Sequence, residues 1–135
     1  VAGYSGSLRQ RLLVGRYAVP AANPREVERW VDECVPGVRF GGTAGAYRLV
    51  EHYRGPLTVA HIGPGAEEVR KRLKALASPD GDLIWMRKIG SASEVGDSPG
   101  TVHPLLIYAE LVTDSDPRAL ESAAAVRERY LSWSH

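Results

Sequence analysis

Frequent prolines and glycines divide this chain into short segments, and this feature limits its fold more than any other. Among 135 residues there are 14 glycines and 9 prolines, residue types that interrupt helices and strands and form turns. The length indicates one domain, because domains commonly contain roughly 100–200 residues. The longest uninterrupted apolar run is 105–109, far shorter than the ~20 residues needed to span a bilayer.

Hydrophobic spacing between the turns predicts strands that alternate with helices, followed by two successive helices. Extended segments are expected at about 8–19, 38–40, 57–62 and 82–89. Helices are expected at 24–34 and at about 43–51, and further helices are expected to begin at 63–65, 104 and 117. This order indicates an α+β fold with a central mixed β-sheet flanked by helices and ending in a two-helix C-terminal pair. An α/β fold is the alternative, but the strands are short and long crossovers are missing.

Capping residues support several of these helix starts. Asn23 and Pro24 provide a favoured cap and first helical position, and a glutamate three residues after the cap completes a capping box. Thr43 and Asp116 are expected to cap later helices. Because only residues 113–115 join the last two helices, those helices are expected to be neighbours in space.

Apolar side chains at helical spacing indicate the buried face of each helix. In the helix after 63–65 the inward positions are Val69, Leu73 and Leu76. Cys34 lies on such a face, so it is interpreted as a small buried hydrophobe rather than a nucleophile. In the last two helices the inward positions are Leu105, Leu106, Ala109 and Val112, and then Leu120, Ala123, Ala124, Val126, Tyr130 and Leu131.

Charge and cysteine content exclude several classes of protein. The chain has 17 Lys and Arg against 16 Asp and Glu, a formal net charge of +1, so nucleic-acid binding would need a local basic patch. A single cysteine excludes an internal disulfide framework and suits a reducing compartment, so we expect a cytoplasmic protein. The histidines lack the paired spacing of a zinc site, and we expect no metal or cofactor; they are His52, His61, His103 and His135.

The densest basic run lies in the helix that follows 63–65. Glu67 to Lys71 and Glu68 to Arg72 are pairs at i, i+4 in the favourable acid-first order, which indicates an ordinary solvated helix face. Other cations remain without a local partner and are the candidate patch for nucleic acid or for a protein partner; they are Arg70, Lys74, Arg87 and Lys88.

Support for catalysis is weak. Gly63-Pro64-Gly65 follows an expected strand and opens a helix, as a phosphate-binding loop does, but Glu68 occupies the third glycine position. We therefore interpret it as a turn and helix start, with a small nucleotide-handling enzyme as a remaining alternative. The close aspartates fall at turn and cap positions, where this residue is structurally favoured; they are Asp80, Asp82, Asp114 and Asp116.

The last third of the chain resembles a known family. The stretch 103–111 (HPLLIYAEL) is followed by Asp116-Pro117-Arg118, then by Glu121 and Ala124, then by Tyr130-Leu131. This order resembles the C-terminal signature of bacterial type IV abortive-infection (AbiE-class) antitoxins, P-L-L-x-Y-A-D-L, then D-x-R, E-x-x-A and Y-L. Residues 40–46 and 57–62 resemble the family's aromatic-x-G-x-x-A-A segment and following strand. Two departures are Glu110 in place of Asp and Ala44-Gly45-Ala46 in place of the Ala-Ala pair.

The resemblance implies a non-enzymatic antitoxin and regulator of phage defence. Such proteins typically join an N-terminal winged helix-turn-helix, which binds operator DNA and autoregulates the operon, to a C-terminal domain that neutralises a nucleotidyltransferase-like toxin. Residues 1–135 would correspond to the C-terminal domain alone, with a flexible leader at about 1–7. The start at Val1 rather than at Met agrees with a piece of a longer polypeptide. A nucleic-acid-binding module with a basic helix face is the main alternative.

The motif residues implied by the resemblance are expected to be mainly structural. An ion pair between Glu110 and Arg118 is expected to lock the corner between the last two helices, because these residues lie on either side of the short joint. Truncating one partner of such a pair, if it is partly buried, costs more than the pair contributes. The motif residues are Gly42, Ala46, Tyr108, Glu110, Asp116, Arg118, Glu121 and Tyr130.

Overall fold

The computed structural model describes residues 12–51, 53–88, 100–113 and 116–131. The expected leader at 1–7, His52, His135, Asp114 and nearly all of the expected polar loop at 91–100 lie outside them. The elements in chain order are β1 (Leu13–Ala18), α2 (Pro24–Cys34), β2 (Arg39–Gly41), α3 (Gly42–Val50), β3 (Thr58–Ile62), α4 (Ala66–Leu73), β4 (Leu76–Ala77), β5 (Leu83–Arg87), α5 (Pro104–Val112) and α6 (Pro117–Tyr130).

The strands form one mixed sheet, which confirms the α+β prediction. Within the described residues it has five strands in the order β2-β3-β5-β1-β4. β3 and β5 are parallel, with Val59 opposite Ile84, whereas the other neighbouring strands are antiparallel. The register of β1 shifts between Leu13 and Gly15, so the extended segment expected at 8–19 contains an irregularity at its glycine.

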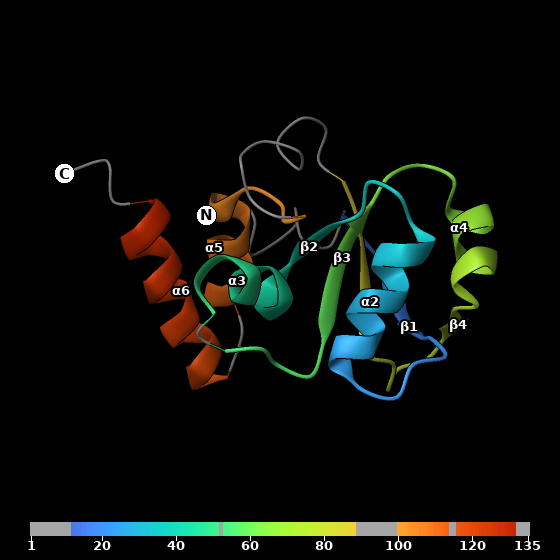
Figure 1. Ribbon diagram of the computed structural model, residues 1–135, viewed down its shortest axis with the longest axis horizontal. Helices are drawn as coiled ribbons and strands as arrows, with labels where there is room; N and C mark the ends of the chain where they lie inside the picture. Colours follow the sequence, from blue (N-terminus) through green and yellow to red (C-terminus); the bar gives the residue numbers. More distant parts are fainter. Residues whose placement is uncertain (1–11, 52, 89–99, 114–115, 132–135) are drawn as a thin grey trace.

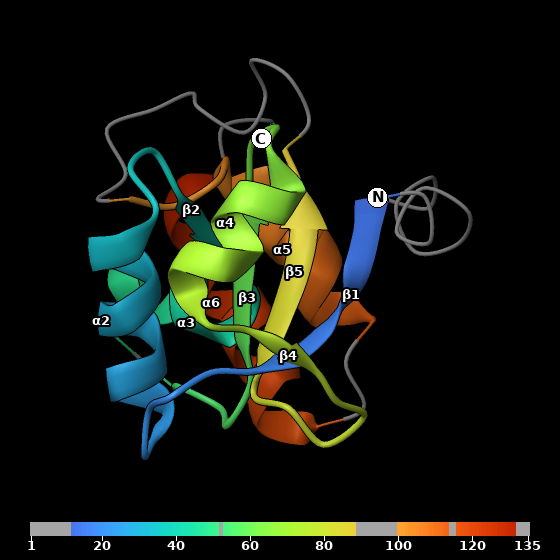
Figure 2. The same ribbon diagram turned by 90° about the vertical axis from the view of Figure 1, so that its right-hand side faces the viewer.

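Helices cover both faces of the sheet (Figure 1). Side chains along β5 alternate between the faces, as strand geometry requires. Leu83 and Trp85 belong to the core beneath α2 and α4, and Ile84 and Met86 pack with Ala109 of α5 on the other side. Figure 2 shows α4 in front of the strands, with α5 and α6 behind them.

The start of α2 follows the capping prediction. The Asn23 side chain accepts a hydrogen bond from the Glu26 N–H at 3.0 Å, and the Glu26 carboxylate accepts from the Ala22 N–H at 2.9 Å. Farther along the helix, Trp30 Nε1 donates to the Leu73 carbonyl oxygen at 2.8 Å. That bond fixes α2 against the end of α4 and occupies a carbonyl left without a helical partner.

Two predictions about helix ends are wrong. Leu76 does not complete the buried face of α4, because Lys74 takes a left-handed conformation that ends the helix. The chain then enters β4, where Leu76 pairs with Ala18 of β1 and is 69% exposed. Thr43 does not cap α3, which begins one residue earlier; its hydroxyl instead accepts a bond from the Gly55 N–H at 2.9 Å.

The last two helices are neighbours, as the short joint predicts. Asp116 caps α6, because its side chain accepts a hydrogen bond from the Arg118 N–H. The shared core also differs from the expected stripes: Leu105 is 48% exposed and Leu120 is 46% exposed, and Ala124 is exposed as well. The buried cluster that joins α3, α5 and α6 contains Ala46, Leu49, Val102, Ile107, Leu111, Ala119, Ala123 and Val126.

Candidate functional site

The two segments that carry the family resemblance meet at the buried carboxylate of Glu110. Oε1 accepts a hydrogen bond from the backbone N–H of Gly42 at 3.0 Å, and Oε2 lies 3.0 Å from Nε2 of the fully buried His61. Gly42 is the first residue of α3, so the carboxylate also interacts favourably with the positive end of that helix. A Cβ at Gly41 would overlap the carboxylate, so this position needs glycine. We assign Glu110 an architectural role.

The predicted ion pair between Glu110 and Arg118 is wrong. The guanidinium group of Arg118 instead lies 3.4 Å from Asp116 Oδ2 and 4.6 Å from the ring centre of Tyr53. The Arg118 side chain is mostly exposed to solvent, whereas Glu110 is buried in the interior. The two side chains therefore do not meet.

Hydrogen bonds at the cap of α6 stabilise the charged form of Asp116. The pKa of Asp116 lies below its ordinary value of 3.8, first because the backbone N–H of Arg118 donates to the carboxylate and second because the Tyr53 hydroxyl does. The Tyr53 hydroxyl bond is 2.9 Å long. Both donors favour the charged form of Asp116. Because Tyr53 belongs to the segment after α3, its hydrogen bond to Asp116 connects that segment to the start of α6.

Among the remaining motif residues, Ala46, Tyr108 and Tyr130 lie in packing positions, whereas Glu121 does not. Ala46 is fully buried and Tyr108 packs against the same cluster. The Tyr130 hydroxyl donates to the Leu49 carbonyl oxygen at 3.3 Å, so it ties the end of α6 to the end of α3. Glu121 is exposed on α6, and its negative charge raises the pKa of Arg118 after the larger effects of Asp116 and Tyr53.

The basic run on α4 forms ion pairs with its own helix. Arg72 lies 3.7 Å from Glu68, as the i, i+4 spacing predicts. The pair predicted between Glu67 and Lys71 is wrong, because Glu67 instead lies 3.4 Å from Arg70, three residues away. Arg70 is therefore not without a local partner, and this exposed pairing agrees with a solvated helix face.

The four residues of the candidate basic patch do not converge on one point. Arg87 is paired in register with Ile62, so Arg87 and Lys88 lie at the sheet edge from which the chain enters α4. Lys74 lies at the opposite end of α4. Two of the four cations thus belong to α4 or its C-cap, and the other two lie at the end of β5.

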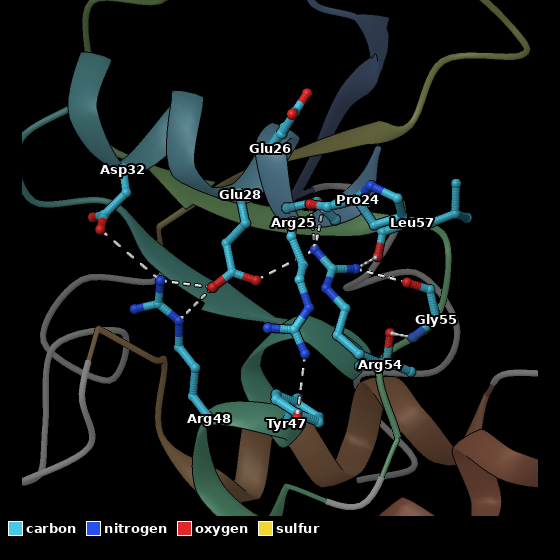
Figure 3. A network of polar contacts seen from close by, with 12 residues as sticks. Pro24, Arg25, Glu26, Glu28, Asp32, Tyr47, Arg48, Arg54, Gly55 and Leu57 are labelled. Atoms are coloured by element: carbon cyan, nitrogen blue, oxygen red, sulfur yellow. Dashed lines mark hydrogen bonds and ion pairs between the residues drawn. The ribbon is translucent and has the colours of Figure 1, made fainter. Parts of the chain in front are cut away.

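Neither the spacing of residues nor the family resemblance indicated a pocket between α2 and α3. Its volume is about 410 Å³, within the range of roughly 300–1,000 Å³ typical of small-molecule sites. The lining residues come from α2, from α3 and from the segment that follows α3, and all but Arg29 and Glu51 are labelled in Figure 3. They are Arg25, Glu28, Arg29, Asp32, Tyr47, Arg48, Glu51 and Arg54.

One carboxylate joins two arginines at the inner wall of this pocket. Glu28 Oε2 accepts from Arg48 Nε at 2.7 Å, and Glu28 Oε1 accepts from Arg54 Nη2 at 3.3 Å (Figure 3). Burial lowers the pKa of Arg54; the Glu28 carboxylate opposes that shift, and the positive charges of Arg25 and Arg48 add to it. Arg54 therefore lies near two other arginines, Arg25 and Arg48, and near one carboxylate, Glu28.

Arg54 also fixes the shape of the inner wall. Its side chain is only 8% exposed, and its two terminal nitrogens donate to Gly55, Leu57 and Pro24 carbonyl oxygens at 2.7, 3.1 and 3.1 Å. A further bond of 2.6 Å reaches the Thr58 hydroxyl. These bonds connect the start of α2 to the segment before β3, so Arg54 is a structural arginine.

The outer wall carries arginines with unused donors. Arg25 donates to the Tyr47 hydroxyl at 3.3 Å, with its guanidinium group 5.3 Å from the ring centre. Arg29 lies one turn farther along α2, and its side chain makes no hydrogen bond or ion pair with any described residue. Guanidinium groups are planar, permanently charged donors that suit oxyanions, so this wall has the chemical character of an anion site.

Part of this pocket was detectable in the sequence. Arg25 and Arg29 are four residues apart on the predicted helix at 24–34, so they share one helix face. The inner wall was not detectable, because Glu28, Arg48 and Arg54 are brought together by the packing of α3 against α2 rather than by local spacing.

Other candidate chemistry finds no support in the described parts of the chain. No group of three or more His, Cys, Asp or Glu side chains is placed there to hold a metal ion. The pKa of Cys34 is raised, first by burial and second by the charge of Glu33, which lowers its thiolate fraction. Gly65 precedes α4, as the interpretation of 63–65 as a turn and helix start predicts.

Comparison with known proteins gave one match, and it covers almost the whole chain. The family model described as "Transcriptional regulator, AbiEi antitoxin, Type IV TA system" matches residues 1–132. Neither the curated proteins nor the solved structures gave a significant match. Among the described residues, no helix combines the length and apolar character needed to cross a membrane.

Proposed function

Because the chain belongs to the AbiEi antitoxin family of type IV toxin–antitoxin systems, we propose that it neutralises a nucleotidyltransferase-like toxin by binding, without a reaction of its own. In a longer protein that carries a winged-helix half, this domain would also contribute to autoregulation of the operon through operator DNA. The recognition surface is the pocket between α2 and α3.

The observation that carries this proposal is that some pocket arginines are bound within the protein, whereas others have donors available for a partner. Arg48 and Arg54 are held by Glu28 and shape the wall, whereas Arg29 has no partner within the described residues. Buried polar groups that are satisfied stabilise a fold, but exposed cations beside a rigid concave wall are suited to recognition. The family match gives this recognition its biological context.

Growth rescue tests the antitoxin role directly. The chain is co-expressed with a nucleotidyltransferase-like toxin of a type IV system, chosen from the gene next to its own if that gene encodes one, and colony formation is compared with cells that carry an empty plasmid. We expect colonies only when the chain is present. Toxin levels are followed by immunoblot, so that reduced toxin synthesis is not mistaken for neutralisation. Continued growth arrest, in cells where the chain accumulates as a folded protein, would contradict the proposal.

A nucleic-acid-binding module is the second candidate function. It is favoured by Lys74, at the end of α4, and Arg87, at the end of β5, whose side chains form no hydrogen bond or ion pair with any described residue. Binding through phosphate contacts weakens with salt, with a log–log slope of about −0.9 for each contact on duplex DNA. A slope of that kind, lost on neutralising Lys74 and Arg87, would support this function; salt-independent binding would exclude it.

A further inference from the structure

The pocket between α2 and α3 has more positive charge than its carboxylates neutralise. Four arginines and three acidic residues line it. Glu28 is shared by Arg48 and Arg54, so one negative charge serves two positive charges. Asp32 is 3.9 Å from Arg48 at the exposed rim, a distance and exposure at which solvent screens most of the attraction. With Glu51 counted, the lining residues carry one more positive than negative charge, so the pocket favours an anion.

The available donors come from both helices that border the pocket. Arg25 and Arg29 are one helical turn apart on α2, and the Tyr47 hydroxyl of α3 lies opposite them, 3.3 Å from Arg25 Nη2. Figure 3 shows the Arg25 guanidinium extended from α2 toward Tyr47, between Arg48 and Arg54. Two guanidinium groups and a hydroxyl can together surround a group that has three or four oxygen atoms.

The wall behind these donors is fixed before any ligand arrives. The guanidinium group of Arg48 lies 4.5 Å from the ring centre of Phe40, which is fully buried. Arg54 is held by carbonyl oxygens, by the Thr58 hydroxyl and by Glu28. Preorganised walls reduce the entropy that binding loses, so the pocket needs little rearrangement to accept an anion.

We propose that this pocket binds a terminal phosphate group, held by Arg25 and Arg29 and by the Tyr47 hydroxyl. A terminal phosphate has three free oxygens and can accept from both guanidinium groups and from the hydroxyl at once, whereas a carboxylate has only two oxygens. The pocket is compact, so it suits the phosphate of a free nucleotide or of an oligonucleotide end rather than the side of a duplex. This inference rests on the proposed function, because it assigns a ligand to the pocket that we propose as the recognition surface. Its test does not involve the toxin.

Calorimetric titration of the full chain tests this proposal with matched pairs of probes. AMP is compared with adenosine, and a 5′-phosphorylated RNA hexamer is compared with the same hexamer bearing a 5′-hydroxyl. We expect saturable binding of the phosphorylated member of at least one pair, and much weaker binding of its partner. The pair that shows this difference identifies the source of the phosphate.

Variants then locate the binding. Arg25→Gln and Arg29→Gln should each weaken binding of the phosphorylated probe about tenfold, as loss of one charge-assisted hydrogen bond predicts. Arg70→Gln, on the exposed face of α4, is the matched control and should bind as the wild type does. Circular dichroism should show unchanged melting for all three variants, because these side chains are exposed.

Three results would overturn the proposal. They are equal binding of the phosphorylated and unphosphorylated probes, unchanged binding in both pocket variants, and binding of a hexaglutamate peptide in place of the phosphorylated probes. The last result would assign the pocket to carboxylates of a protein partner. Failure of growth rescue with phosphate binding intact would contradict the antitoxin role alone, so the two proposals fail separately.

Discussion

At the scale of single residues, Glu110 is expected to contribute more to stability than any exposed acid. Glu110→Ala leaves the buried Gly42 N–H without its acceptor and the His61 ring without its hydrogen-bond partner, which should lower the free energy of unfolding by roughly 2–4 kcal/mol. Glu128→Ala, on the exposed face of α6, is the matched control and should change it by no more than about 0.5 kcal/mol. Urea unfolding measures both, and equal effects would contradict the architectural role.

Asp116 provides a prediction about pH. Its pKa is lowered in the folded state by the Arg118 N–H first and by the Tyr53 hydroxyl second. A depressed folded-state pKa adds stability above the unfolded-state pKa, and that stability is lost as the pH falls through the folded-state pKa. Asp116→Asn retains an oxygen for the cap but cannot titrate.

The wild type should therefore exceed Asp116→Asn in stability by a constant amount down to about pH 5, and the difference should shrink below about pH 4. Urea unfolding of both proteins between about pH 3 and pH 7 measures it. A difference that does not change with pH, or that grows in acid, would show that the carboxylate is not stabilised in the fold.

Residue roles were only partly predictable from the sequence. Asp116 was correctly assigned as a cap, because a cap depends on the next few residues alone. Glu110 was paired with the wrong cation, because the short joint made Arg118 its nearest candidate in sequence. Its actual contacts, Gly42 and His61, come from strands and helices far away in the chain, and no local pattern indicates them.

At the scale of elements, the close approach of α3 to β2 depends on Gly45. A Cβ at this position would lie 2.5 Å from the Phe40 carbonyl oxygen, so Gly45→Ala should destabilise the protein although alanine favours helices by about 1 kcal/mol. Gly63→Ala is the control, because a Cβ there would meet nothing within 4 Å. Thermal melting should fall for the first variant only, and an unchanged or higher midpoint for Gly45→Ala would refute this packing.

Helix boundaries were more predictable than helix faces. The cap and proline signals placed the starts of α2 and α6 correctly. The stripe expected on α5 was wrong at Leu105, because α5 packs on the sheet as well as on α3 and α6 and buries residues such as Ile107 and Leu111. Leu76 was misplaced because the left-handed Lys74 diverts the chain into β4, an outcome set by pairing with β1.

At the scale of the whole molecule, the sheet separates two apolar cores, and the pocket lies where the helices of the two sides meet. α2 belongs to one core and α3 contributes to both. The arginines that line the pocket come from α2, from α3 and from the segment after α3, and they leave the space between these elements open. The mixed sheet and helix pair could be predicted from alternating elements, but the inner wall of the pocket could not, because Glu28 and Arg54 are 26 residues apart in sequence and meet only through tertiary packing.

Growth rescue by charge-neutralised variants tests most directly whether the domain recognises its target through this pocket. The double variant Arg25→Gln/Arg29→Gln is compared with Arg70→Gln/Lys74→Gln, each co-expressed with the toxin at matched protein levels. We expect the pocket variant to lose rescue and the α4 variant to retain it. Full rescue by the pocket variant, or loss of rescue by the α4 variant alone, would contradict the account.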